Sequence, residues 1–423
     1  MKSKPVQWLV AAALLLTIAA PGWAQPELVG GEFKVNQVDD ARQVNPQVAF
    51  GPSGSSLIVW ENSIRGILGR GFDKDGNPTT GEMVLAGNDN LPGIPARGNV
   101  IVRKEPALIY LPSGEFLVFW TEEKDFLSLD YFYEQREILE QDVYGQRFTA
   151  QGTPAGERFR VNASAVHFQR RPKAALHPAG IVVVWEQAPR QNERDSTAVY
   201  GRLLTRRGTL TGGELRIDAA ESREVWHLAV AANTAGQFVV TWEGDKADDP
   251  NILARIYDRD GDALGSPFLA NSSVPGRQRR PAAVATRDGD FLIAWQSSLR
   301  GTEIRSTMGQ LFSPAGARIG REIEMSRGNV GHLHTCPALA LLPSGNVVVT
   351  WIDWAGTFPD GIYARLLDSD GNPLESAVLI SEERIFPQYL ISVATNAQGD
   401  IVATWESRIT RERAIAARRL KAD

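Results

Sequence analysis

Residues 236–242 read Gly-Gln-Phe-Val-Val-Thr-Trp, a glycine followed by an apolar run that ends at Trp242. Six similar runs occur along the chain, ending at Trp60, Trp120, Trp185, Trp295, Trp351 and Trp405. A glycine stands six residues before the tryptophan in six of the seven copies. Successive tryptophans are 53 to 65 residues apart. The chain is therefore one unit written seven times, and we number the units repeat 1 to repeat 7.

Each repeat is predicted to hold four short strands, a to d. Strand a begins at a proline in five copies, strand b ends at the tryptophan, and strand c carries a small residue followed by Arg or Gln, as in Gly201-Arg202. Strand d follows a second turn glycine. Strand b is apolar on both faces, because neighbours such as Val239 and Val240 point to opposite sides. Such strands need sheets packed on both faces, which predicts four-stranded antiparallel blades of a β-propeller.

The two ends of the chain suggest how the blades close. Repeat 7 runs out at Asp423 where its strand d should come, and an orphan d-type stretch lies at Gly30–Asn36. We predict an all-β, seven-bladed propeller over residues 25–423, a single domain whose N-terminal strand completes the last blade and removes open edges. The alternative is an open array of β-units, which needs capping repeats that the sequence lacks.

Over residues 30–423 the pattern resembles the Trp- and Gly-punctuated propeller repeats of secreted bacterial proteins. It lacks the Asp-box of sialidases and the Gly-His/Trp-Asp signature of WD40 blades. The resemblance implies the propeller fold and carries no catalytic residues.

Residues 1–24 have the pattern of an export signal. Lys2 and Lys4 precede an apolar run from Trp8 to Ala20, and small residues stand at Gly22 and Ala24. The run is shorter than the roughly 20 residues of a membrane span, so we expect cleavage after Ala24 rather than an anchor. The mature chain is then secreted or periplasmic, without a later membrane span.

Composition limits the possible partners. The chain has 45 Lys and Arg against 50 Asp and Glu, a net charge of −5, which argues against nucleic-acid binding. Its single cysteine, Cys336, excludes an internal disulfide framework and a Cys-rich zinc site.

Residues present in every copy are expected to be structural. The seven tryptophans are predicted to anchor the core, and the Arg/Gln set of strand c to form a repeated hydrogen-bonding device. Asp-x-Asp-Gly at 73–76, 258–261 and 368–371 could suggest calcium, but the same turns elsewhere lack the Asp pair. Hairpin turns explain these segments better. Glu follows the tryptophan in four repeats (Glu61, Glu186, Glu243 and Glu406), and we expect cross-strand pairing with Arg rather than a ligand site.

Length variation points to one face of the propeller. The b–c and d–a connections lie on one side, here named the loop face, and the a–b and c–d turns on the other, the turn face. Insertions fall on the loop face, at 86–105, 121–142 and 186–198. The second insertion interleaves acids and aromatics, which suits sugar or peptide recognition; the alternative is a short helix or flap that packs on the blades. Its candidate ligand-binding residues are Glu122, Glu123, Asp125, Tyr131 and Tyr133.

Other candidates occur once each on the loop face. Gly331-His332-Leu333-His334-Thr335-Cys336 could offer metal ligands, but ordinary loop chemistry explains it better, and we predict no metal site. His334 and Arg103 occupy a position that holds Gln43, Gln169, Gln278 and Gln388 in other repeats, and this set is expected to rim a channel. The remaining ligand-binding candidates are Trp226, His227, Asp353 and Trp354.

No Ser-His-Asp order, phosphate loop or zinc signature occurs in the sequence. We therefore expect a monomeric, non-catalytic, exported propeller, without a cofactor, that binds a glycan, protein or surface component on the loop face. Two alternatives stay open. One is a propeller glycoside hydrolase or lyase; hydrolysis needs two carboxylates about 5–9.5 Å apart, with Glu122, Glu123, Asp125 and Asp353 as candidates. The other is a structural module of an envelope complex.

Overall fold

The computed structural model describes residues 25–39, 41–89, 97–130, 133–164, 166–190, 197–218, 225–244, 250–272, 276–299, 305–326, 332–355, 358–382, 390–407 and 413–422. The predicted export signal and Tyr131 lie outside these residues. Every regular element in the described ranges is a β-strand, and none of these ranges contains a helix that could cross a membrane. The all-β prediction is confirmed.

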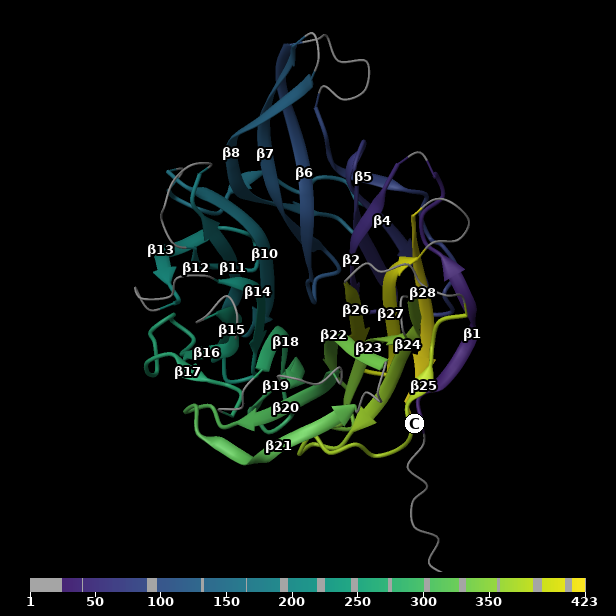
Figure 1. Ribbon diagram of the computed structural model, residues 1–423. Helices are drawn as coiled ribbons and strands as arrows, with labels where there is room; N and C mark the ends of the chain where they lie inside the picture. Colours follow the sequence, from purple (N-terminus) through teal and green to yellow (C-terminus); the bar gives the residue numbers. More distant parts are fainter. Residues whose placement is uncertain are drawn as a thin grey trace, which may run out of the picture.

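Five repeats each form a separate four-stranded antiparallel blade. Their strands are β2 (Gln43–Phe50), β3 (Ser56–Asn62), β4 (Gly66–Phe72) and β5 (Met83–Gly87) in repeat 1; β6 (Arg97–Tyr110), β7 (Phe116–Asp130), β8 (Tyr133–Phe148) and β9 (Phe159–Arg160) in repeat 2; β10 (Phe168–His177), β11 (Gly180–Ala188), β12 (Ala198–Leu204) and β13 (Leu210–Arg216) in repeat 3; β14 (Trp226–Ala232), β15 (Phe238–Gly244), β16 (Asn251–Tyr257) and β17 (Phe268–Leu269) in repeat 4; and β26 (Ile391–Thr395), β27 (Asp400–Ser407), β28 (Ala414–Lys421) and β1 (Glu27–Lys34) in repeat 7. The propeller architecture is thus confirmed, with the blades arranged about a centre in Figure 1.

Repeats 5 and 6 share one eight-stranded sheet. It contains β18 (Gly276–Ala285), β19 (Phe291–Leu299), β20 (Arg305–Phe312), β21 (Arg318–Ser326), β22 (His332–Leu341), β23 (Val347–Ala355), β24 (Phe358–Leu367) and β25 (Val378–Leu379). A parallel bridge between Arg305 and Leu333 joins β20 to β22. The prediction of seven separate sheets is therefore corrected: hydrogen bonding gives five separate blades and one double sheet.

The N-terminal strand lies at the outer edge of the last blade, beside the C-terminal strand. β1 pairs antiparallel with β28, with Glu27 opposite Lys421 and Phe33 opposite Ala417. The Val35 backbone N–H continues this pairing by donating to the Ile415 carbonyl (2.8 Å). The orphan d-type stretch thus occupies the place that its sequence predicted.

Apolar clusters fill the space between consecutive repeats. One contains Leu117 and Phe119 of repeat 2 with Val183 and Trp185 of repeat 3, and another contains Trp60 of repeat 1 with Val402 of repeat 7. All seven repeat tryptophans are at most 3% exposed. Their predicted role as core anchors is confirmed, and their burial is what fixes each blade against its neighbour.

Strand c connects neighbouring blades as expected. Arg202 and Arg255 each donate from a side-chain N–H to a carbonyl at the end of the preceding repeat's strand d, Val161 (3.0 Å) and Ile217 (3.1 Å) respectively. The Asp-x-Asp-Gly segments are hairpin turns. In the first of them Asp73 Oδ1 accepts the backbone N–H groups of Asp75 (2.9 Å) and Asn77 (2.8 Å), and Gly76 has φ = 85°.

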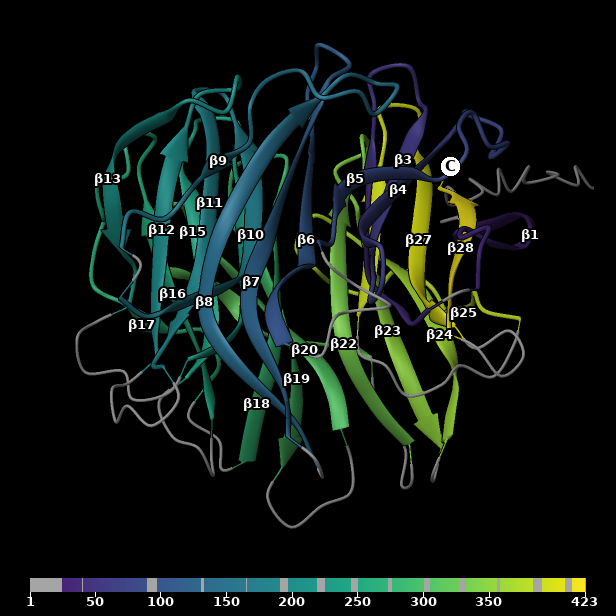
Figure 2. The same cartoon turned by 90° about the horizontal axis from the view of Figure 1, so that it is seen from above.

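The second insertion forms neither a helix nor a flap. It lengthens the blade of repeat 2, so that β6, β7 and β8 have 14, 15 and 16 residues. These strands project from one side of the molecule in Figure 1, and Figure 2 shows them lying beside one another in a second view. Pairing of β7 with β8 runs from Trp120–Tyr144 to Asp130–Tyr133, with one register shift between Lys124 and Asp125, and these ladder bonds explain the extension.

Candidate functional site

A strained backbone position marks the inner strand of six repeats. Asn45, Glu105, Arg171, His227, Arg280 and Cys336 have φ of 52–58°. Each lies at a register shift in the first strand of its blade. These first strands surround the centre of the molecule in Figure 1. A left-handed conformation is uncommon for residues other than glycine, so this bulge is a maintained feature of the inner strands.

Carboxylates from the preceding repeat hold these bulges. The His227 N–H donates to Glu186 Oε1 (3.0 Å), and the Arg280 N–H to Glu243 Oε2 (3.3 Å). The same bond joins Glu105 to Glu61 (3.0 Å). The predicted pairing with Arg is also confirmed for Glu186, whose Oε2 lies 3.1 Å from an Arg171 nitrogen. The sequence did not predict that these glutamates accept backbone N–H groups. It did show the position they bind, which is the residue directly before the proline position of strand a.

Burial acts on three of the carboxylates that follow a repeat tryptophan. It raises the pKa of Glu61 and of Glu186, partly offset by their hydrogen-bond and arginine partners. Burial likewise raises the pKa of Glu406, to about 7. At Arg171 burial opposes the charge, but Glu186 and Glu105 outweigh it and raise the pKa. The second strands of these blades and the inner strand β10 therefore carry charged groups whose protonation depends on their neighbours.

Trp226 and His227, two of the predicted ligand-binding residues, lie together at the start of β14. The side chain of His227 is 43% exposed, and its Nδ1 lies 2.9 Å from Oε2 of the buried Glu243. The guanidinium carbons of Arg170 and Arg171 lie 5.5 and 5.7 Å from the Trp226 ring centroid. We call these four residues and Glu243 the His227 cluster; it places an accessible imidazole beside an aromatic face and two cations.

Lys173 stands two residues after Arg171 on the same inner strand and is only partly exposed. Burial lowers its pKa, while the nearby Glu105 and Glu186 act in the opposite direction. Sequence reasoning did not single out Lys173, because a lysine in strand a gives no signal of its own.

Glu122 and Glu123, two of the predicted acids of the second insertion, are held in ion pairs within the strand extension. Glu122 Oε2 lies 2.8 Å from Arg103 Nε and 2.6 Å from an Arg158 nitrogen. Glu123 is 1% exposed and pairs with Lys104 (2.5 Å). Asp125 is buried to the same degree. Tyr133 begins β8, and its side chain lies outside the described residues.

His334, Asp353 and Trp354 come together in repeat 6. His334 Nδ1 lies 2.8 Å from Ser326 Oγ, and its Nε2 lies 3.5 Å from Asp353 Oδ1. His334 and Asp353 are each 8% exposed, and Trp354 packs against the core between repeats 6 and 7. Cys336 Sγ accepts a bond from the Arg280 guanidinium (2.7 Å). Throughout the described ranges, no three His, Cys, Asp or Glu side chains are grouped to hold a metal ion.

Of the repeated glutamines, Gln388 lies outside the described residues; the other three, Gln43, Gln169 and Gln278, are buried and do not rim a channel, which corrects the prediction made for them. Gln43 and Gln169 are buried, and each accepts the indole N–H of its own repeat's tryptophan, Trp60 (2.8 Å) and Trp185 (2.7 Å). His334 at the same position packs against Trp351, with ring centroids 5.7 Å apart. The fixed spacing of 16 or 17 residues from Gln to Trp was the signal that could have indicated this bond.

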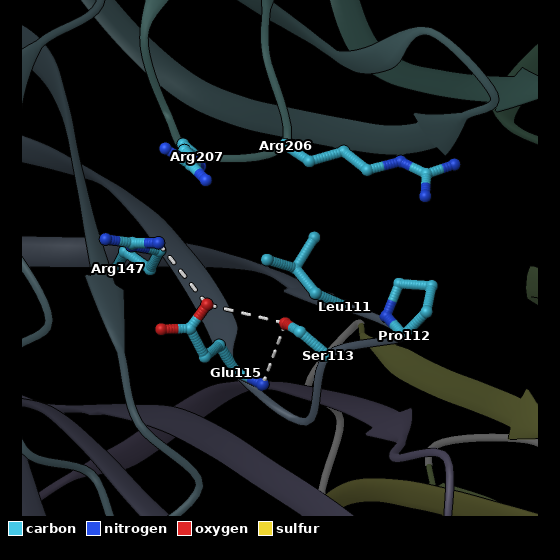
Figure 3. Close-up of a pocket in the computed structure, with 7 residues that line it drawn as sticks. All are labelled: Leu111, Pro112, Ser113, Glu115, Arg147, Arg206 and Arg207. Atoms are coloured by element: carbon cyan, nitrogen blue, oxygen red, sulfur yellow. Dashed lines mark hydrogen bonds and ion pairs between the residues drawn. The ribbon is translucent and has the colours of Figure 1, made fainter.

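A separate pocket lies on the turn face between repeats 2 and 3 (Figure 3). It is lined by Leu111, Pro112, Ser113, Glu115, Arg147, Arg206 and Arg207. Glu115 pairs with Arg147 (3.3 Å), and Arg206 donates to the Pro178 carbonyl (3.1 Å). Because Glu115, Arg147 and Arg206 already bond within the protein, they are less suited to bind a ligand than the His227 cluster.

Comparison with known proteins supports the fold. No family model matches the chain, and no curated protein matches it. A protein of unknown function from Dyadobacter fermentans aligns over 96% of this chain and 100% of its own, with 12% identity and a TM-score of 0.53. The NanB sialidase of Streptococcus pneumoniae aligns over 75% of this chain and 66% of its own, with 7% identity and a TM-score of 0.50. An ulvan lyase, a polysaccharide lyase, aligns over 93% and 94%, with 9% identity and a TM-score of 0.48.

At these identities the comparisons establish the fold alone. Together with the blade pairing, the two alignments with TM-scores of 0.50 and 0.53 support a β-propeller fold.

Proposed function

We propose that this protein is a carbohydrate-active enzyme, a glycoside hydrolase or lyase, that cleaves a glycan chain at the His227 cluster. The observation that carries the proposal is the accessible His227 imidazole held by the buried Glu243 carboxylate (2.9 Å). This revises the expectation of a non-catalytic binder, because an exposed base oriented by a second group is the arrangement that acid–base catalysis uses.

The chemistry follows from the two ring nitrogens. When Glu243 is ionised, Nδ1–H donates to it, and the lone pair on Nε2 is left for a substrate proton. Trp226 supplies an aromatic ring for a sugar, and the guanidinium groups of Arg170 and Arg171 lie over that ring. Removing such a base costs about 10²–10⁴ in rate in typical enzymes.

The test is product release from a panel of glycans, followed by mass spectrometry, with protein that begins at Gln25. His227→Asn and Glu243→Gln are expected to lower kcat at least about 100-fold while the protein stays folded. Glu123→Gln examines the acid favoured by the sequence and should leave kcat nearly unchanged. Full activity in His227→Asn, or loss only in Glu123→Gln, would overturn the assignment. The products separate the two classes, because a lyase leaves an unsaturated sugar and a hydrolase adds water.

A non-catalytic glycan-binding propeller is the second candidate. It is favoured because the neighbouring carboxylates stabilise the backbone. Glu186 accepts the His227 N–H and pairs with Arg171, and Glu105 accepts the Arg171 N–H (3.1 Å). Glycan binding by calorimetry with no products from any glycan would select this candidate.

We further propose that the mature chain, residues 25–423, is one exported, monomeric domain of seven blades in a closed ring. Two observations support the count and the closure. Repeats 5 and 6 are joined by the single Arg305–Leu333 bridge, with an apolar cluster between them like those between other repeats. Repeat 7 contacts repeat 1 through the apolar cluster that holds Trp60 and Val402 and through the bond from the Asn45 N–H to Glu406 (3.0 Å). N-terminal sequencing of the exported protein and light scattering test the processing and the monomer.

A further inference from the structure

A group of arginines lies on the blade of repeat 5, beside the His227 cluster. Arg277 stands opposite Ser298, and Ser298 stands opposite Arg305, so Arg277 and Arg305 form one row across β18, β19 and β20. Directly opposed residues share a face of a sheet, and two strand spacings separate this pair by about 10 Å. Arg279 lies two residues along β18 and therefore shares the face of Arg277.

The arginines connect to the His227 cluster through Glu243. Arg279 Nε lies 3.4 Å from Glu243 Oε1, while Oε2 of the same carboxylate contacts His227. Arg305 is exposed and forms no ion pair with an acidic group within the described ranges. Burial and the charges of Arg279, Arg280 and Arg277 lower the pKa of Arg305, which places these guanidinium groups within electrostatic reach of one another.

Cationic side chains outnumber carboxylates in the described part of this region. Among the described residues here, seven cationic side chains stand with three carboxylates, Glu105, Glu186 and Glu243: Arg170, Arg171, Lys173, Arg277, Arg279, Arg280 and Arg305. The full chain carries −5. A positive region on an acidic protein concentrates anions at that place.

We propose that the cluster takes an anionic glycan, one that bears uronate carboxylates or sulfate esters, with Arg277 and Arg305 binding the acidic group of a sugar next to the one held at Trp226 and His227. This inference rests on the proposed function and names its substrate class. Guanidinium groups suit it because their planar N–H pairs match carboxylate and sulfate oxygens.

The test measures binding by calorimetry to a polyuronate, a sulfated glycan and a neutral glucan of equal length, at low and high salt. Both anionic chains, or one of them, should bind at least about tenfold more tightly than the glucan, and salt should weaken that binding. Tight binding of the polyuronate identifies a carboxylate as the acidic group, and tight binding of the sulfated glycan identifies a sulfate ester. Arg305→Gln should weaken binding of the anionic glycan about tenfold. Arg305→Lys keeps the charge and should weaken that binding less. Arg207→Gln, on the turn face, is the matched control.

The outcomes separate this inference from the proposed function. Equal binding of glucan and anionic chains, or no effect of Arg305→Gln in a folded protein, overturns the anionic class while cleavage through His227 can still hold. A DNA oligonucleotide that binds as tightly as the best glycan would also overturn it. Anionic binding without any products leaves this inference standing and contradicts the enzyme.

Discussion

In repeats 1, 3 and 5 the buried tryptophan donates its indole N–H to a glutamine. The sequence predicted the buried tryptophans from the apolar runs that they close. It did not predict the glutamine partner, because the direction of a side chain depends on the bulge that follows it. Repeat 4 has Val225 at this position, and Trp242 Nε1 lacks a hydrogen bond there.

Gln169→Leu tests the value of this bond. The change leaves the Trp185 N–H buried without an acceptor, which should lower the free energy of unfolding by about 1–3 kcal/mol. Urea denaturation followed by tryptophan fluorescence measures it. Gln151→Leu, in an exposed turn, is the control and should change stability by less than about 0.5 kcal/mol. Equal effects of the two changes would contradict the assigned bond.

At the scale of the element, strand order was readable from the repeat, whereas the form of the second insertion was not. Its acids and aromatics suggested a ligand-binding loop, yet the chain extends β7 and β8 and pairs Glu122 and Glu123 with Arg103 and Lys104 of β6. Such pairing depends on register across three strands, which local sequence does not specify.

The N-terminal strand β1 is expected to stabilise the whole molecule. Deleting residues 25–36 removes the pairing with β28 and the buried Val35 and partly buried Phe33, at about 1.5–3 kcal/mol for each fully buried side chain. Calorimetry should show a lower Tm for the entire unfolding transition, and a peptide of residues 25–36 should restore it. Removing Gln25 alone should have no effect. An unchanged Tm after the longer deletion would contradict closure through β1.

For the molecule as a whole, the constant repeat predicted the blade arrangement, because each unit buries its apolar faces only against a neighbour. The joining of repeats 5 and 6 could not be read from the sequence, since it depends on the approach of β20 to β22 at a single bridge. The His227 cluster was foreseen only in Trp226 and His227. Its two arginines come from repeat 3 and its carboxylate from repeat 4, and only the fold brings them together.

The buried carboxyl group of Glu406, which accepts the Asn45 N–H across the junction of repeats 7 and 1, should make stability depend on pH. Burial raises the pKa of Glu406 from 4.5 to about 7, so between these values the folded protein keeps a proton that the unfolded chain has lost. The free energy of unfolding should therefore fall by about 3 kcal/mol as pH rises from 4.5 to 7, because the unfolded chain gives up its proton more easily than the folded protein.

Glu406→Gln removes the titration and keeps an acceptor for the Asn45 N–H. Gln296 already occupies the equivalent position in repeat 5, where it accepts a bond from Thr335 Oγ1 (2.6 Å). Urea denaturation between pH 4.5 and 7 should show a flatter profile for this variant than for the unchanged protein. Glu157→Gln, at an exposed site, should keep the original profile. If the free energy of unfolding changes with pH in the same way in Glu406→Gln and in the unchanged protein, Glu406 is not the titrating group.

The location of the glycan site is tested most directly by a crystal structure of His227→Asn, in which cleavage is slowed, with an oligosaccharide from the glycan panel. We expect the sugar chain on the loop face at the inner ends of repeats 3 to 5, with one ring against Trp226 and the scissile linkage beside residue 227. An oligosaccharide bound along the β7–β8 extension, or in the turn-face pocket, with the His227 cluster empty, would contradict the account.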